Sequence, residues 1–398
     1  MDAARLIGRE RGLFAQDIAE NKTTLSDAIS GARVLIYGGA GSIGKEVVAQ
    51  VFRRNPSALH VIDISENNLV ELVRDLRSSL GYIDGETMFL PIDMGGVETQ
   101  AFLATQKPYD YVLNIAAMKH VRSEKDAYSL MRMIDTNVLN TVETLRHARS
   151  GGARKYFAVS TDKAKNPGNL MGATKRIMEG LLFERTDSAT TVSTARFANV
   201  AFSDGSLLHG FRQRLLQRQP ISAPRDIRRY FVTLEEAGHL CLASLVLGKE
   251  REIFFPKLTT ALLPLSFSDI AIRFLAAHSY DAEQVDSEDE ARGRVEELIS
   301  RGKWPCYFFD SDTSGEKPLE EFYSDDDDVE FDRYADIGVI RSPLPSVQDG
   351  QRLARFLNRV HQLREKAAWS LDELTTELYM ACPELAHIRT GKFLDERM

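Results

Sequence analysis

Three consecutive residues offer the clearest chemistry in this sequence. Thr161, Asp162 and Lys163 bring together a hydroxyl, a carboxyl and an amine. In a cleft, an adjacent carboxyl and amine can be kept in different protonation states, so that one serves as a general acid and the other as a general base. The alternative interpretation is a helix N-cap with an exposed ion pair, because Ser, Thr and Asp are preferred cap residues.

A glycine-rich segment at residues 38–44 forms a second candidate site. It lies between an apolar run at residues 33–37 and a segment of helical periodicity. Its glycine spacing permits a tight turn, a close approach to a pyrophosphate and close helix packing, while the helix N-terminus attracts the anion. An ordinary glycine turn is the alternative. The residues expected to bind a dinucleotide here are Gly38, Gly41, Ser42, Ile43 and Gly44.

Acidic residues after the next two apolar runs extend this site. Asp63 ends the run at residues 59–63, where a carboxylate can accept hydrogen bonds from ribose hydroxyls. No lysine or arginine follows within residues 64–71, so the pattern favours NAD over NADP. Asp93 is a candidate adenine contact, and a loop-capping aspartate is an equal alternative.

These candidates follow apolar runs that alternate with helical sequence. Runs typical of buried strands occupy residues 33–37, 59–63, 88–92, 111–115, 156–160 and 191–195. After about residue 203 the pattern loosens, and residues 252–255 are an isolated strand candidate in the smaller part over the sheet. Strands spaced by helices predict an α/β fold with a doubly wound, Rossmann-like parallel sheet. Such sheets bind ligands at the carboxyl ends of their strands, which is where the candidate residues lie.

The pattern along the chain predicts four parts. They are an N-terminal helical segment at 1–30, an NAD-binding domain at 31–205, a smaller substrate-binding region at 206–345, partly interleaved with the sheet, and a C-terminal helical extension at 346–398. The charge-rich stretch at 281–297 predicts a solvated helix or an insertion.

The composition limits the classes of partner and the compartment that this chain can have. The net charge is −8, so the basic surface that nucleic-acid binding requires is missing. The three cysteines form no CxxC pair, which favours buried thiols in a reducing compartment. No apolar stretch is long enough to span a bilayer and no secretory signal is evident, so we expect a cytoplasmic protein. The acidic run at 325–328 predicts a solvated turn rather than a metal site.

Further motifs resemble one enzyme family. The glycine spacing is the form seen in short-chain dehydrogenases, and the segment at residues 160–175 is similar to the signature of polysaccharide-biosynthesis dehydratases that act on UDP-N-acetylglucosamine. The resemblance runs from about residue 31 to residue 340. The other matching stretches are residues 116–121, 196–200, 226–233 and 315–318. Met171 stands where most members have the catalytic tyrosine, four residues before Lys175, as in one branch of these dehydratases.

The resemblance implies a redox-neutral dehydration with bound NAD. The sugar C4 is oxidised, the C5 proton is removed, water leaves from C6 and the hydride returns to C6. Lys163 would remove the C5 proton, Asp162 would protonate the departing hydroxyl, and Thr161 would hydrogen-bond the C4 oxygen. Lys175 would hold the nicotinamide ribose. A thioether cannot replace a phenolate, so Lys163, Asp162 or a water must take the C4 proton in place of Met171.

The resemblance also implies a UDP-sugar partner. A homo-oligomer is a separate expectation, with residues 346–398 as a candidate contact. Ala116 is a candidate cofactor contact, and Lys119, Asn199 and Arg229 are candidate substrate contacts. Arg229 could equally form a structural ion pair. Two other functions remain open: a UDP-sugar 4-epimerase, which needs no acid–base pair for C6, and a non-catalytic NAD-binding protein, which Met171 would favour.

Overall fold

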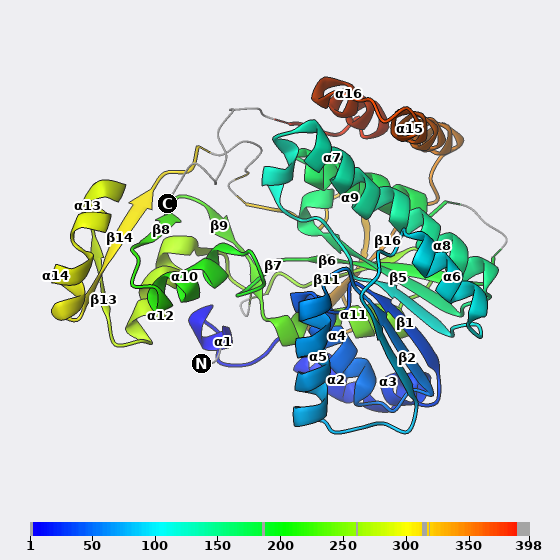
Figure 1. The fold of residues 1–398 in the computed structure, drawn as a ribbon, viewed down its shortest axis with the longest axis horizontal. Coiled ribbons are helices and arrows are strands. Elements are labelled where there is room, and N and C mark those ends of the chain that lie inside the picture. The colour runs from blue at the N-terminus through cyan, green and yellow to red at the C-terminus, as the bar shows by residue number, and fades with distance from the viewer. Residues whose placement is uncertain (1–2, 185–187, 260–261, 313–316, 318, 388–398) are drawn as a thin grey trace.

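A nine-stranded sheet forms the centre of the molecule (Figure 1). The computed structural model describes residues 3–184, 188–259, 262–312, 317 and 319–387. The sheet order is β15-β16-β11-β6-β5-β4-β1-β2-β3. The parallel strands are β1 (Arg33–Tyr37), β2 (Ala58–Ile62), β3 (Glu86–Leu90), β4 (Tyr111–Asn114), β5 (Lys155–Thr161), β6 (Thr191–Phe197) and β11 (Glu252–Pro256), and the antiparallel edge comprises β16 (Ile337–Arg341) and β15 (Asp328–Glu330). The predicted doubly wound sheet is confirmed.

Helices cover both faces of this sheet, which explains why its strands are apolar runs without alternation. One layer comprises α2 (Ala15–Glu20), α3 (Lys22–Ile29), α4 (Ser42–Phe52), α5 (Glu66–Ser79) and α11 (Leu234–Leu247). The other comprises α6 (Val97–Thr105), α7 (Ala127–Ile134), α8 (Asn140–Ser150) and α9 (Leu170–Leu182). Among the described residues, no helix combines the length and apolar character needed to cross a membrane.

A smaller lobe stands beside the sheet (Figure 1). It contains a three-stranded parallel sheet of β8 (Ile221–Pro224), β14 (Lys303–Phe309) and β13 (Asp281–Gln284) with α1 (Ala3–Leu6), α10 (Leu207–Leu216), α12 (Phe267–Ala276), α13 (Glu288–Gly293) and α14 (Val295–Ser300). Two short ribbons lie between lobe and sheet: β7 (Asn199–Val200) with β10 (Phe231–Val232), and β9 (Arg228–Arg229) with β12 (Leu265–Ser266). The domain boundaries remain a prediction.

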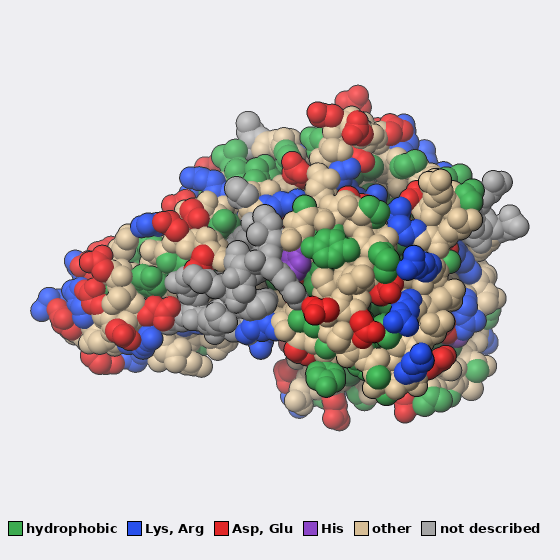
Figure 2. Space-filling view, turned by 90° about the horizontal axis from the view of Figure 1, so that it is seen from above, with side chains coloured by type: hydrophobic (Ala, Val, Ile, Leu, Met, Phe, Trp, Pro, Cys, Tyr) green, Lys and Arg blue, Asp and Glu red, His purple; other side chains and the backbone are tan. Residues whose placement is uncertain are grey.

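The charge-rich stretch of the lobe differs from its predicted structure. Residues 281–284 form strand β13, which pairs with β14, and only the residues after it are helical. The prediction of a helix was wrong for this strand because charged side chains that flank an edge strand remain solvated and hide its pattern. Figure 2 shows acidic and basic side chains mixed over this outer end of the lobe.

The C-terminal segment forms two helices, the second of which ends at residue 381. Helices α15 (Val347–Glu365) and α16 (Leu371–Ala381) lie against α7 and α9. The buried residues of α15 are Leu353, Phe356, Val360 and Leu363, which join one apolar cluster with α9. Residues 388–398 lie outside the described residues. The three cysteines are buried free thiols, as predicted.

Candidate active site

The predicted site residues meet at one edge of the sheet. Because β1, β2, β4 and β5 are parallel, the segments that follow them share their carboxyl edge. The glycine segment follows β1, Asp63 follows β2, Ala116 lies two residues beyond β4, and Asp162 follows β5.

The three glycines have distinct roles in the turn. Gly38 has φ +73°, and a Cβ there would lie 2.4 Å from the Ala116 amide nitrogen. At Gly44 a Cβ would lie 2.1 Å from the Gly38 carbonyl oxygen, so helix and loop pack too closely for a side chain. At Gly41 the nearest protein atom would be 3.6 Å away, so the fold itself leaves room for a methyl group. Gly41 thus gives an outside group, such as a pyrophosphate, access to the N-terminus of α4.

Contacts on each side fix the glycine turn. Asp63 Oδ2 accepts a hydrogen bond from the Ala40 amide at 2.9 Å, and its Oδ1 accepts one from the Ser65 amide at 2.9 Å. The Ser42 hydroxyl accepts from the Asp204 amide at 2.8 Å, and Ile43 packs on the main core. A carboxylate held here retains lone pairs for ribose hydroxyls. The edge therefore fits a dinucleotide.

Asp93 makes the contacts of a loop cap. Its Oδ1 accepts from the Gly95 amide at 3.0 Å, and its Oδ2 lies 2.7 Å from Arg132 Nη2. Its contact to an adenine remains a prediction.

Asp162 and Lys163 form a largely buried pair, so the interpretation as an exposed ion pair was wrong. The segment Asp162–Ala164 is a 3-10 turn, η3, directly after β5. Asp162 Oδ1 accepts from the Thr161 hydroxyl at 2.9 Å and from Lys163 Nζ at 3.1 Å. The Asp162 side chain is 2% exposed and that of Lys163 is 19% exposed. Asp162 Oδ2 is buried without a hydrogen-bond partner among the described residues, although Thr161 does cap the turn through a 3.4 Å contact.

Glu320 is a member of the site that sequence reasoning missed. Its Oε1 lies 3.9 Å from Lys163 Nζ, and its side chain is 4% exposed. Burial raises the pKa of Glu320, and the nearby Asp162 carboxylate acts in the same direction, although Lys163 opposes both. The two partners are more than 150 positions apart in the sequence, so no spacing pattern could link them. The only signal was that Glu320 lies two residues after the family-like stretch at 315–318. Of that stretch, only Lys317 lies within the described residues.

Helix α9 carries Met171 and Lys175 on its first turns. Lys175 is 3% exposed and its Nζ donates to the Val159 carbonyl at 3.0 Å. Burial lowers the pKa of Lys175 to about 7, although Glu179 opposes that shift. Met171 is 3% exposed within the apolar cluster beneath α15, and its amide donates to Glu124 at 2.7 Å.

Two further buried contacts support this edge and were also missed. Arg196 pairs with Glu179 at 2.7 Å, and Ser160 donates to the same carboxylate at 2.7 Å. Asn137, in the π-helical turn η2 (Asp135–Leu139), bonds both the amide and the carbonyl of Met118, which fixes the chain after β4. These buried contacts fix the strand ends and the helix that carry the site residues.

The predicted substrate contacts lie around the same edge but differ in environment. Lys119 is exposed and donates to the Ser203 hydroxyl at 3.2 Å. Asn199 Nδ2 is buried without a partner among the described residues, so it could donate to a ligand after a small movement. Arg229 is 3% exposed and donates to the Arg228 and Lys317 carbonyls, each at 2.8 Å. The UDP contacts of these residues remain predictions.

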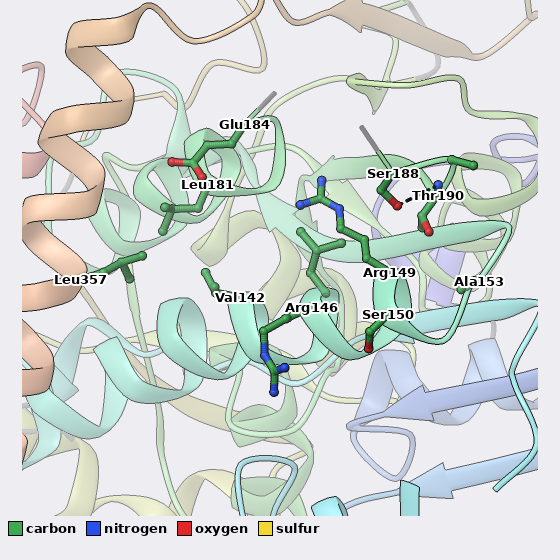
Figure 3. A pocket seen from close by; sticks show the side chains of 13 residues that line it. Val142, Arg146, Arg149, Ser150, Ala153, Leu181, Glu184, Ser188, Thr190 and Leu357 are labelled. Atoms are coloured by element: carbon green, nitrogen blue, oxygen red, sulfur yellow. Dashed lines mark hydrogen bonds between the residues drawn. The ribbon is translucent and has the colours of Figure 1, made fainter. Parts of the chain in front are cut away.

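The cavity shown in Figure 3 lies elsewhere. It has a volume of about 630 Å³, and its wall includes Arg149, Leu181, Glu184 and Thr190. These residues lie near the beginnings of β5 and β6, at the opposite edge of the sheet from Asp162. None of the described residues that line it was predicted for the active site.

The fold and this edge define a Rossmann-like protein with a buried acid–amine pair beside a dinucleotide turn. A model of the family described as "Polysaccharide biosynthesis protein" matches residues 34–297, more than half of the chain. The chain belongs to this family, and the predicted relationship is confirmed. The significance of methionine at position 171 remains a prediction.

Relatives in other organisms differ in how much of their length is matched. The "Uncharacterized membrane protein MJ1061" of Methanocaldococcus jannaschii is 31% identical over 64% of this chain and 74% of that protein. The capsular polysaccharide biosynthesis protein CapD of Staphylococcus aureus is 31% identical over 61% of this chain, but the chain spans only 41% of CapD. A UDP-N-acetylglucosamine 4,6-dehydratase (inverting) of Campylobacter jejuni is 29% identical over 58% of this chain and 68% of that enzyme.

Other similar proteins include epimerases and solved structures. A UDP-glucose 4-epimerase of Rickettsia typhi is 28% identical over 65% of this chain and 79% of that enzyme. The structure of Pen from Bacillus thuringiensis is 25% identical and covers 80% of this chain and 90% of its own, with a TM-score of 0.65. The dTDP-glucose 4,6-dehydratase DesIV of Streptomyces venezuelae, solved with NAD and TYD, is 19% identical and covers 84% of this chain and 97% of its own, with a TM-score of 0.56. This last likeness establishes the fold.

Proposed function

We propose that the protein dehydrates a UDP-N-acetylhexosamine, with UDP-N-acetylglucosamine the preferred candidate, to a UDP-4-keto-6-deoxy sugar for polysaccharide biosynthesis, with bound NAD. The observation that carries the proposal is the buried Asp162–Lys163 pair at 3.1 Å, directly after β5 and at the same edge as the glycine turn. Elimination of water needs a base and an acid beside the oxidised carbon, and this pair supplies both groups.

Residues of this chain would hold the cofactor at three points. Gly41 and the N-terminus of α4 would receive the pyrophosphate, Asp63 the adenosine ribose and Lys175 the nicotinamide ribose. The lysine must release its bond to the Val159 carbonyl or share it, since its Nζ can donate three hydrogen bonds. NAD supplies a hydride acceptor and donor, which accounts for a redox-neutral reaction.

Thr161 and Asp162 can take the C4 proton that a tyrosine would otherwise accept. The Thr161 hydroxyl already donates to Asp162 Oδ1, so it can accept the C4 hydroxyl proton while it passes its own to the carboxylate. Asp162 then holds a proton to give to the departing C6 hydroxyl, which leaves as water. Lys163 removes the C5 proton and returns it to C5 after hydride reaches C6.

The alternative is a UDP-sugar 4-epimerase, which the similarity to the Rickettsia enzyme favours. Mass spectrometry and NMR of UDP-N-acetylglucosamine incubated with the protein would separate the two. Loss of one water supports the dehydratase, and a C4 epimer of unchanged mass supports the epimerase. Unchanged substrate across common UDP-sugars would contradict both enzymes and favour a non-catalytic NAD-binding protein. Lys163→Ala must abolish water loss if the assigned roles hold.

A further inference from the structure

Glu320 reaches the acid–base centre from a separate part of the chain. Its Oε1 lies 3.9 Å from Lys163 Nζ, beyond hydrogen-bond distance but close enough for a small side-chain movement to join them. Both groups are largely buried. A second carboxylate so close to the amine is not needed to balance its charge, because Asp162 already does so.

Side chains from two other parts of the chain hold the segment that carries Glu320. Arg196 Nη1 donates to the Phe322 carbonyl at 2.6 Å, two residues further along. Asn166, from the loop after the site, donates to the Glu321 carboxylate at 3.0 Å. These contacts hold the two residues that follow Glu320, so the proximity of Glu320 to the centre is built into the fold.

The charges around Glu320 favour a carboxyl group that binds a proton. The groups that act on it are Asp162, Lys163, Arg229 and Lys317. Burial is the largest influence and raises its pKa, with Asp162 adding to the effect and the three cations opposing it. Glu320 is therefore more basic than an ordinary glutamate. It also faces Lys163, whose ammonium group must lose a proton before the amine can act as the base at C5.

We propose that Glu320 accepts the Lys163 ammonium proton and keeps Lys163 as the free amine that can remove the C5 proton. The inference rests on the proposed function, since only a base at C5 needs this state. The transfer converts an ammonium and a carboxylate into an amine and a carboxylic acid, with no net proton change. The amine takes the C5 proton as the C6–oxygen bond breaks, Asp162 protonates the leaving hydroxide, and Lys163 later returns its proton to C5. Glu320 thus acts through Lys163 and is a positioning residue.

The test compares the pH dependence of water loss for the wild-type enzyme, Glu320→Gln and Glu321→Gln. The wild type should show a rate plateau around neutral pH, because the internal transfer does not depend on pH. Glu320→Gln should be at least tenfold slower at pH 7, and its rate should rise with pH by about tenfold per unit, because without Glu320 the ammonium proton must go to solvent. The control variant Glu321→Gln lies on the same segment and should keep the wild-type profile, because the glutamine amide oxygen can still accept the hydrogen bond from Asn166. A Glu320→Gln profile that is lower but parallel to the wild type overturns the proposal, as does an unchanged rate.

A second measurement separates failure of this proposal from failure of the proposed function. Lys163 is accessible enough to be acetylated by acetic anhydride, and peptide mass spectrometry can quantify that residue alone. In the wild type its acetylation rate should be nearly flat around neutral pH, and in Glu320→Gln it should fall as pH decreases. If no UDP-sugar is converted but this difference is found, the dehydratase assignment fails and the proton coupling stands. If water is lost but the two acetylation profiles coincide, the coupling fails and the dehydratase stands.

Discussion

Gly41→Ala separates cofactor binding from folding at the glycine turn. Gly41 has φ −70°, which alanine adopts without strain, and an added Cβ would meet its nearest protein atom at 3.6 Å, an ordinary contact. Loss of backbone freedom in the unfolded chain favours alanine by about 0.4–1 kcal/mol, while alanine is the poorer N-cap residue by roughly 0.5–1 kcal/mol. We therefore expect the free energy of unfolding without NAD to change by less than about 1 kcal/mol.

The same methyl group should interfere with a pyrophosphate at the helix N-terminus. Insertion of a methyl group into a close contact costs about 1–3 kcal/mol, which corresponds to roughly 5- to 150-fold weaker NAD binding. The assay is calorimetric titration of NAD into protein stripped of nucleotide, together with urea unfolding. Unchanged NAD affinity in a normally folded Gly41→Ala protein would refute the assignment of this turn.

Two other glycines provide matched controls. Gly152 has φ +70°, and an added Cβ there would meet no atom within 4 Å, so Gly152→Ala should cost about 1–2 kcal/mol of stability and leave NAD affinity unchanged. Gly38 has a similar φ but would clash with Ala116, so Gly38→Ala should cost about 2–5 kcal/mol. The difference between these two variants measures how tightly the turn packs on the end of β4.

Three further substitutions test the buried groups. Burial lowers the pKa of Lys175 from 10.5 to about 7, so between these pH values the unfolded chain binds a proton that the folded chain lacks. The free energy of unfolding should therefore rise between pH 7 and pH 9 by up to about 1.4 kcal/mol per pH unit. In urea unfolding, Lys175→Met should lose this pH dependence. Arg196→Met leaves the buried Glu179 carboxylate with only the more distant Arg176, at 3.7 Å, as a cation, and should cost about 3–5 kcal/mol, most of which an added Glu179→Met should restore. Phe356→Ala on α15 should cost about 3–5 kcal/mol in the same assay, whereas Val347→Ala, 78% exposed on the same helix, should cost less than about 0.5 kcal/mol.

The sheet was predictable because its signal is local. Strands buried on both faces are continuous apolar runs, and a parallel arrangement brings their ends to one edge. Asp63 and Asp162 could therefore be assigned to a common site from the strand pattern, while Ala116 was added by the family resemblance. The boundaries shifted by a residue or two: β2 ends at Ile62, one residue before the predicted end.

The rest of the site depends on pairs that no local pattern encodes. Glu320 approaches Lys163 only because the chain returns to the sheet after building the smaller lobe. Arg196 on β6 pairs with Glu179 on α9, 17 positions earlier, because that helix packs beside the strand. The orientation of Arg229 toward two backbone carbonyls was equally hidden, because residue type alone does not distinguish a guanidinium that binds a phosphate from one that anchors a loop.

Under the proposed function, Met171 is accounted for by a proton path through neighbouring residues rather than by a lost activity. Its side chain packs in an apolar cluster, so this position supplies no titratable group. The Thr161 hydroxyl bonded to Asp162, the amine of Lys163 and the carboxyl of Glu320 nevertheless lie together, with Asp162 Oδ2 lacking a partner among the described residues. A buried carboxylate oxygen without a partner costs stability unless it serves a ligand or holds a proton. A protein that only bound NAD would gain nothing from retaining that cost, whereas an enzyme that moves protons at C4, C5 and C6 needs each of these groups.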